Sequence, residues 1–358
     1  MDLFAHPLAA CGGFGDMEAT MRLTRLLIVA VTLFCWSVSA QAGDDVKIGT
    51  SGAQELRIPV GSGGTAMAGS GVAYSNGIDA LYWNPAGAAS VEGVDLMLSR
   101  RQYIADIDID YLVAARPMGD LGVFGITAKV LSMGDEIVTT IADPDGNGET
   151  FSSSFSIIGL SWARTLTDRV AVGANGNVIY EKIADQTATG VAFDVGVQYN
   201  PGWNNMTFGA VIKNLGPRMR FDGRGFDQET DTSDDPNGRN HSTRTQSSSF
   251  EIPSYVQLGM AYKILEQEHS VVHLTGAFQS NNFSEDEFRF GAEYAYNGAF
   301  FLRGGYTDSR QKEYLYGFTA GAGLNLALGE TTLKFDYAWG ESDLFEDNQT
   351  FTFLIDFD

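Results

Sequence analysis

Strict alternation of apolar and polar side chains, repeated to the C-terminus, is the feature that most constrains the fold of this chain. In residues 333–340, Leu, Phe, Tyr and Trp alternate with Lys, Asp, Ala and Gly. Segments 287–296 and 314–326 repeat the pattern, the second with Gly, Thr and Asn on its small face. Because successive side chains of a β-strand point to opposite faces, each segment predicts a strand with one apolar face and one polar or small face.

These segments predict about fourteen strands, joined by connections of alternating length. Connections after even-numbered strands are short, as at 117–120 and 265–269, whereas those after odd-numbered strands are often longer, as at 133–152 and 215–253. Outer-membrane barrels have short periplasmic turns and longer outer loops, so an even strand count with both ends at the periplasm fits this parity. The predicted strands are 94–101, 105–116, 121–132, 153–164, 170–182, 188–199, 206–214, 254–264, 270–279, 286–297, 299–308, 313–326, 331–341 and 349–357.

A soluble β-sandwich also alternates, with apolar residues facing inward, and an exported soluble β-protein stays open as an alternative. The barrel is favoured because the small face carries many Gly and charged residues of both signs, as a crowded polar lumen would. Aromatic residues also gather near strand ends, and segment 351–357 resembles the aromatic C-terminal signal of outer-membrane barrels. The sequence therefore predicts an all-β, transmembrane antiparallel β-barrel over residues 91–358.

The first part of the chain has the pattern of a targeting segment. Within residues 21–42, a basic start precedes an apolar run and a small-residue cleavage site. That order is typical of a secretory signal peptide, and the run is shorter than the ~20 residues that a membrane-spanning helix needs. We interpret residues 1–20 as an over-extended start or a disordered pre-segment. Excision of both would remove Cys11 and Cys35, the only cysteines, so no disulfide scaffold is expected.

Composition excludes several classes of function. The chain has 45 Asp and Glu against 23 Lys and Arg, for a net charge of -22, so it lacks the basic surplus that neutralises nucleic-acid phosphates. No Gly-x-Ser-x-Gly elbow stands in a strand–turn–helix context, and no Walker-type phosphate loop is present. We therefore expect neither nucleic-acid binding nor catalysis.

Residues 43–90 differ from the rest because they lack the alternation and are rich in small residues, which allow close contact with other backbone. The segment contains the strings Gly-Thr-Ser-Gly-Ala-Gln from Gly49, Arg-Ile-Pro-Val-Gly from Arg57 and Ala-Leu-Tyr-Trp-Asn-Pro-Ala-Gly from Ala80. It predicts a plug, or hatch, packed inside the barrel lumen.

In combination, these strings resemble the N-terminus of the PorV/PorQ family, within the wider FadL-like family of outer-membrane proteins. The remainder of the chain is similar in architecture only, since FadL-like proteins are fourteen-stranded barrels with an N-terminal hatch. Residues 62–69 depart from the family pattern, which more usually has an Arg and a Gly-Gly pair there. The motif residues are Gly49, Gly52, Arg57, Pro59, Gly61, Met67, Gly69, Tyr82, Trp83, Asn84, Pro85, Ala86 and Gly87.

The resemblance implies two different functions in the bacterial outer membrane, with its lipid as the surrounding partner. A PorV-like protein would bind secreted cargo proteins and relay them to secretion-complex subunits at the cell surface, in a type IX-like pathway. A FadL-like protein would instead admit hydrophobic small molecules, which leave laterally through a break in the barrel wall. The stronger likeness to PorV/PorQ makes the relay the leading expectation and transport the alternative.

Charged residues on the small face predict a charged lumen. Asp106, Asp108 and Asp110 share one face of their segment, and three neighbouring carboxylates repel unless they are paired or hydrated. A salt-bridged lumen is the preferred interpretation, and an ion-selective path is the alternative. The residues assigned to this lumen charge are Asp106, Asp108, Asp110, Lys129, Arg289, Arg303 and Lys334.

A weak calcium motif lies in the predicted loop 133–152. Asp143, Asp145, Asn147 and Glu149 space oxygen ligands at alternate positions, as calcium loops do, but the full twelve-residue pattern is missing. A polar turn is the preferred interpretation, so no cofactor is expected beyond a possible structural Ca²⁺.

The predicted loop 215–253 is long and has no strand pattern, which indicates a functional or disordered segment. In a PorV-like protein, such a loop would hold partners.

Overall fold

The computed structural model describes residues 49–202, 205–230, 241–310, 316–343 and 345–357, with the backbone alone for Asp106, 228–230 and 241–243. The predicted signal peptide and the segment before it lie outside these residues. Within the described ranges, no helix has the length and apolarity to cross a membrane.

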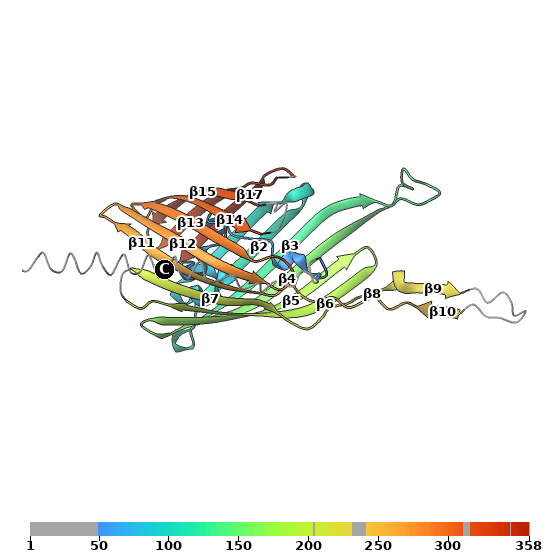
Figure 1. Ribbon diagram of the computed structural model, residues 1–358, viewed down its shortest axis with the longest axis horizontal. Coiled ribbons are helices and arrows are strands. Elements are labelled where there is room, and N and C mark those ends of the chain that lie inside the picture. The colour runs from blue at the N-terminus through green and yellow to red at the C-terminus, as the bar shows by residue number, and fades with distance from the viewer. Residues whose placement is uncertain (1–48, 203–204, 231–240, 311–315, 344, 358) are drawn as a thin grey trace, which may run out of the picture. The chain divides into compact units, whose positions relative to one another are not determined.

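Fourteen long antiparallel strands of the described chain form a closed barrel, as predicted (Figure 1). Each strand pairs with its sequence neighbours, and the ring closes where β1 pairs with β17, from Val94 opposite Phe357 to Gln102 opposite Gln349. The strands are β1 (Val94–Gln102), β2 (Asp108–Pro117), β3 (Val123–Ile137), β4 (Thr150–Thr167), β5 (Val170–Ile183), β6 (Gln186–Tyr199), β7 (Met206–Leu215), β11 (Tyr255–Glu266), β12 (Ser270–Asn281), β13 (Glu287–Tyr296), β14 (Phe300–Ser309), β15 (Phe318–Leu328), β16 (Thr331–Gly340) and β17 (Asn348–Phe357).

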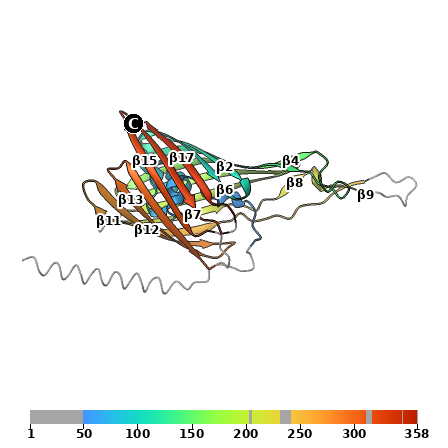
Figure 2. The same cartoon turned by 90° about the horizontal axis from the view of Figure 1, so that it is seen from above.

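The two ends of the barrel differ in their connections. Short turns join β2 to β3, β4 to β5 and β6 to β7 at one end, which we call the turn side. The opposite end, the loop side, carries the extended β3–β4 hairpin and the segment between β7 and β11 (Figures 1 and 2). Because outer-membrane barrels place short turns in the periplasm, the loop side faces the cell exterior.

The predicted long loops contain more strand than the sequence suggested. Strands β3 and β4 continue to Ile137 and from Thr150, so the loop 133–152 shrinks to its tip. The loop 215–253 holds β8 (Phe221–Gly223), which extends the sheet beside β6. It also holds the separate hairpin of β9 (Asp227–Thr230) and β10 (His241–Arg244).

The outward face of the barrel is apolar. Along β1, buried and exposed residues alternate strictly, and the outward Leu98 is 47% exposed. Its cross-strand neighbours Leu112 and Phe353 are also exposed, at 55% and 42%. Such a continuous apolar exterior on a closed barrel is the surface that lipid covers, since a soluble protein would bury it.

Residues 49–90, which we call the hatch, form short helices inside the ring of strands, shown in blue in Figures 1 and 2. Side chains of Val60, Ile78 and Leu81 are at most 2% exposed and belong to one apolar cluster with inward residues of the first strands. The helices are η2 (Gln54–Leu56), α2 (Ser62–Ala66), η3 (Gly71–Ala73), η4 (Gly77–Asp79), α3 (Ala80–Trp83) and η5 (Pro85–Ser90). Further short turns are η6 (Ile104–Asp106), η7 (Gly119–Leu121) and η8 (Arg224–Phe226).

The predicted faces of β2 are wrong. Ile109 and Tyr111 point inward and are buried, at 0% and 4% exposed, whereas Asp108 and Asp110 point outward. Both carboxylates pair with the exposed Arg100, at 2.5 and 3.6 Å from its guanidinium. The inward face of β2 is apolar because it packs against the apolar cluster of the hatch. The side chain of Asp106 lies outside the described part of the chain.

Substitution of Leu98 by Arg tests the lipid-facing band. We expect a loss of about 2–4 kcal/mol in the free energy of unfolding, because a cation near the bilayer midplane is poorly solvated. Urea unfolding in lipid vesicles measures it. The matched control is Ile141→Arg in the exposed β3–β4 tip, where the side chain is 104% exposed. An equal loss in both variants would contradict a membrane-embedded β1.

Candidate functional site

The hatch packs closely against the barrel wall, the ring of strands, at two glycines. Asn84 is fully buried and donates from Nδ2 to the carbonyl of Val72 at 2.7 Å and to that of Val197, in β6, at 3.2 Å. A Cβ atom at Gly196 would lie 1.9 Å from Asn84 Oδ1, and one at Gly173 would lie 2.3 Å from the carbonyl carbon of Pro85. Only glycine therefore fits where the Asn-Pro turn meets β5 and β6.

Two lysines of the barrel wall, Lys129 on β3 and Lys213 on β7, also hold the hatch backbone. Lys129 Nζ donates to the carbonyls of Glu55 and Ile58, both at 2.6 Å, and Lys213 Nζ donates to the carbonyl of Tyr82 at 2.5 Å. The Tyr82 ring centroid lies 5.2 Å from Lys129 Nζ and 3.9 Å from Lys213 Nζ. Burial of an ammonium group is costly, and the carbonyls and the ring face offset that cost.

Hydroxyl groups of β15 and β17 fix the helix α2 to another part of the barrel wall. Ser62 N–H donates to Thr352 Oγ1 at 2.9 Å, and the two side-chain oxygens are 2.8 Å apart. Thr319 Oγ1 donates to the carbonyl of Ala66 at 2.9 Å. Contacts around the whole circumference therefore hold the hatch in place.

A buried charge network lies beside η4. Arg303 Nε donates to Glu293 Oε2 at 2.6 Å, and its Nη1 pairs with Asp336; Tyr74 also donates to Glu293. The carboxylate of Asp79 faces the same groups. Burial raises the pKa of Asp79 to about 7, the carboxylate of Asp336 adds to the rise, and Arg303 opposes it. One guanidinium thus neutralises only part of the carboxylate charge gathered here.

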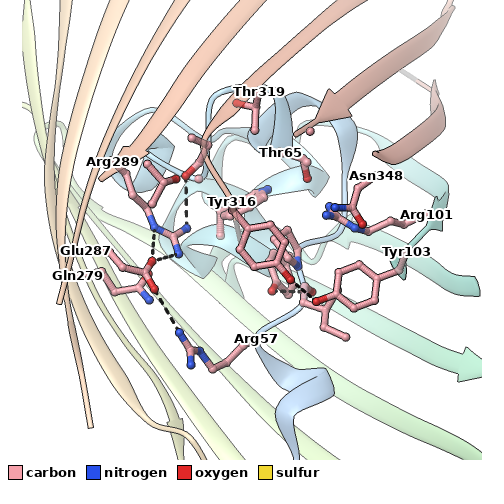
Figure 3. Close-up of a pocket in the computed structure, with 18 of the residues that line it drawn as sticks. Arg57, Thr65, Arg101, Tyr103, Gln279, Glu287, Arg289, Tyr316, Thr319 and Asn348 are labelled. Atoms are coloured by element: carbon pink, nitrogen blue, oxygen red, sulfur yellow. Dashed lines mark hydrogen bonds and ion pairs between the residues drawn. The ribbon is translucent and has the colours of Figure 1, made fainter. Parts of the chain in front are cut away.

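A cavity of about 350 Å³ lies on the loop side of the hatch, and we call it the loop-side cavity (Figure 3). Its walls combine aromatic rings with cations, and Figure 3 shows the side chains of Tyr103 and Tyr316 meeting across it. The two tyrosine hydroxyls are hydrogen-bonded. The lining residues used below are Arg57, Tyr82, Trp83, Arg101, Tyr103, Tyr255, Glu287, Arg289, Tyr316, Glu341 and Asn348.

A second cavity, of about 580 Å³, lies on the turn side of the hatch. It is lined by hatch residues such as Tyr74 and Ser90 and by polar wall residues such as Gln198, Lys263 and His273. Gln198 Nε2 donates to the hatch carbonyl of Ser75 at 2.9 Å. The hatch therefore stands between two cavities, one at each end of the lumen.

The motif residues of the hatch have separate structural roles. Arg57 pairs with Glu287 at 3.3 Å, and Tyr82 donates to the carbonyl of Ile58 at 2.9 Å. Several glycines allow close contacts, since added Cβ atoms would meet Phe250 at Gly52, Asp79 at Gly61, Arg289 at Gly69 and the Ser75 carbonyl at Gly87. Gly49 has open space around it. Met67 and Ala86 are buried between the hatch and the barrel, and Pro59 lines the loop-side cavity.

The predicted lumen charges are partly in place. Arg289 pairs with Glu287 at 2.6 Å, Arg303 joins the network beside η4, and Lys334 lies 3.6 Å from Asp356. Together with Lys129, these cations face inward and pair with carboxylates or with hatch carbonyls. Asp108 and Asp110 do not belong to this set, because they point outward.

The predicted calcium residues are not brought together. Asn147 Nδ2 donates to Glu149 Oε2 at 3.0 Å, and Asn147 Oδ1 accepts from the Glu149 N–H at 2.9 Å. In the described ranges, no three His, Cys, Asp or Glu side chains are grouped closely enough to hold a metal ion. The segment with Asp143 and Asp145 is an exposed turn.

Sequence reasoning missed Arg101 and Asn348, which line the loop-side cavity. Alternation along β1 does put Arg101 on the face of Met97 and Ser99, opposite the outward Leu98. This alternation would have placed the guanidinium of Arg101 in the lumen. Its lack of a carboxylate partner depends on contacts between distant strands, which no local pattern reports.

Replacing Gly173 by Ala should weaken the hatch seat. The added methyl group overlaps Pro85, so we expect a loss of about 1–3 kcal/mol in stability and faster proteolysis of the hatch. The matched control is Gly176→Ala in the same strand, whose Cβ would meet Phe193 at an ordinary 3.6 Å. Equal proteolysis rates for the two variants would refute the close seat.

Asp79→Asn should remove a pH dependence of hatch stability. Since the folded-state pKa is raised to about 7, Asp79 binds a proton more tightly in the folded protein. Its stabilising contribution to the free energy of unfolding is fully present below pH about 4 and is lost as the pH rises through about 7. Proteolytic susceptibility of the hatch should therefore increase between pH 5 and 8 in the original protein and change less in Asp79→Asn. Parallel curves for both proteins would rule out this role.

No protein-family model and no curated protein sequence matches the chain. Its fold does match solved structures. CymD, a monoaromatic hydrocarbon channel, superposes with a TM-score of 0.51 at 13% identity, over 83% of this chain and 96% of that chain. A FadL homologue of Pseudomonas aeruginosa gives 0.51 at 12% identity, over 84% and 99%.

The toluene transporter TodX of Pseudomonas putida also gives 0.51 at 13% identity, over 81% of this chain and 96% of that chain. These likenesses concern the fold. With its closed ring of strands, apolar exterior and internal hatch, the chain has the fold of the FadL-like barrels and lies in the bacterial outer membrane.

Proposed function

We propose that the protein is an outer-membrane channel for small hydrophobic molecules, which bind first in the loop-side cavity. The observation that carries the proposal is an aromatic-lined cavity on the outer side of the hatch, inside a closed barrel. Apolar pockets with a few placed polar groups are typical of small-molecule sites. The fold likeness supports this function, since two similar barrels carry the names of a monoaromatic hydrocarbon channel and a toluene transporter.

Passage then requires a route past the hatch. The hatch separates the loop-side cavity from the turn-side cavity, so a solute reaches the periplasm only if the hatch shifts or if the wall opens. The wall pairing is interrupted between Phe193 and Val195, where β6 and β7 change register. Met219, which follows β7, packs against Gly190 of β6, three residues before Phe193. We propose that the hatch shifts, because it contacts the barrel through hydrogen bonds and packing, whereas an opening in the wall would leave backbone N–H and C=O groups unpaired in lipid.

A disulfide between α2 and the wall tests this route. Ser62 and Thr352 have side-chain oxygens 2.8 Å apart, so a Ser62→Cys, Thr352→Cys pair should oxidise readily. We expect the oxidised pair to lose most uptake of 1-N-phenylnaphthylamine, a neutral aromatic dye, into cells with a lipopolysaccharide-covered outer membrane. Reduction should restore uptake, and Ser62→Cys alone is the control.

Two outcomes would contradict the proposal in different ways. If the oxidised pair admits the dye as fast as the reduced pair, the hatch does not move, and the interruption between β6 and β7 becomes the route. If cells making the unmodified protein take up no more dye than cells without it, the channel function itself is wrong.

Relay of exported proteins, the function first expected from the resemblance, stays a prediction. It would need a protein-binding surface on the loop side, and the β9–β10 hairpin is one place for it. Pull-down of native protein from cells that secrete surface proteins would test it.

A further inference from the structure

Arg101 is a buried cation that no carboxylate of the described residues neutralises. Its side chain lies on the lumen face of β1 with the residue 4% exposed, and its Nε and Nη1 atoms have no hydrogen-bond partner there. The ring of Tyr103 lies beside the guanidinium, with 5.4 Å from the ring centroid to Cζ. By contrast, Arg289 and Arg303 each pair with a glutamate at 2.6 Å. A buried guanidinium without an acid is costly, so it marks a place for an anion.

Further unpartnered polar groups surround Arg101. Thr350 lies directly opposite it on β17, is 1% exposed and has no partner for Oγ1. Asn348, two residues along the same face, is 2% exposed, and neither atom of its amide is hydrogen-bonded within the described chain. Figure 3 shows Arg101 and Asn348 next to each other at the edge of the loop-side cavity. Buried polar groups in proteins are rarely left unsatisfied, so this cluster is arranged for a polar ligand group or for water.

The charge of the cavity favours an anion over water alone. Three arginines, Arg57, Arg101 and Arg289, line it together with two glutamates, Glu287 and Glu341. The surplus is one positive charge, inside a chain whose net charge is -22. Glu287 already pairs with both Arg57 and Arg289. Arg101 is the cation left over, and its planar fork suits a carboxylate.

The remainder of the cavity suits a flat apolar body. Tyr82, Trp83, Tyr103, Tyr255 and Tyr316 contribute aromatic surface to its lining. A volume of about 350 Å³ is at the low end of the ~300–1,000 Å³ range of ligand pockets, which favours a compact molecule over a long chain.

We propose that the loop-side cavity binds a small aromatic carboxylate, with its carboxylate on Arg101 and Asn348 and its ring against the tyrosines. This inference rests on the proposed function, because it names the substrate class of the same cavity. The anionic group adds affinity and orientation that a neutral hydrocarbon would lack.

Calorimetric titration of the purified full-length protein in detergent micelles tests the proposal. Benzoate should bind, whereas benzyl alcohol, which keeps the ring without the charge, and acetate, which keeps the charge without the ring, should bind at least tenfold more weakly. Arg101→Gln should weaken benzoate binding at least tenfold, with little change for benzyl alcohol. The matched control is Arg100→Gln, because the neighbouring Arg100 points outward and pairs with Asp108, and it should leave benzoate binding unchanged.

The outcomes separate this proposal from the channel function. Equal binding of benzoate to the original protein and to Arg101→Gln would overturn it, as would acetate binding as tightly as benzoate. Arg101→Lys, which keeps the charge, should retain part of the affinity, and unaltered heat-modifiable migration would show that each variant is folded. If dye uptake persists while benzoate does not bind, the channel function stands and the carboxylate assignment fails; if neither occurs, both fail.

Discussion

The hydrogen-bond ladder between β1 and β17 is the constraint on which the rest of the structure depends. In a bilayer, each unpaired backbone group costs several kcal/mol, so a membrane-spanning sheet must leave no edge. Closure brings Val94 beside Phe357 and Gln102 beside Gln349, although these residues stand at opposite ends of the barrel sequence. Once the ring is closed, lipid takes the outward face, and the lumen is a space that side chains and the hatch must fill.

Filling that lumen explains most of the inward polar residues. The hatch consists of helices of three to six residues, so many of its carbonyl groups have no partner within the helix. Wall side chains supply the donors: Lys129 and Lys213 reach one part of the hatch, and Asn175 Nδ2 donates to the carbonyl of Leu81 at 2.8 Å. The inward Lys129 and Lys213 therefore hold the hatch.

The loop-side cavity differs from the rest of the lumen because it holds a cation without an acidic partner among the described residues. Most inward cations have a carboxylate or a carbonyl partner, whereas Arg101 has a ring and open space beside it. The same lumen thus has a closely fitted region, where the Asn84–Pro85 turn meets Gly173 and Gly196, and a looser region on the side that faces the cell exterior. A binding cavity on the outer side of the hatch, with a hatch that shifts, is consistent with passive uptake of small molecules.

The sequence by itself determined the fold class, the number of strands and most strand limits. The reason is that alternation and turn residues are local signals, and lipid on one face of each strand requires an apolar residue at every second position. It also separated the hatch from the barrel, since small residues without alternation stand out from their neighbours. It assigned the faces of β2 wrongly, because Ile109 and Asp110 alternate equally well with either one inward. Only the tertiary structure decided that question, because the apolar hatch cluster lies behind that strand and draws Ile109 and Tyr111 inward. For the same reason, the pairing of Arg289 and the lack of an acid beside Arg101 emerge only when strands distant in sequence meet around one lumen.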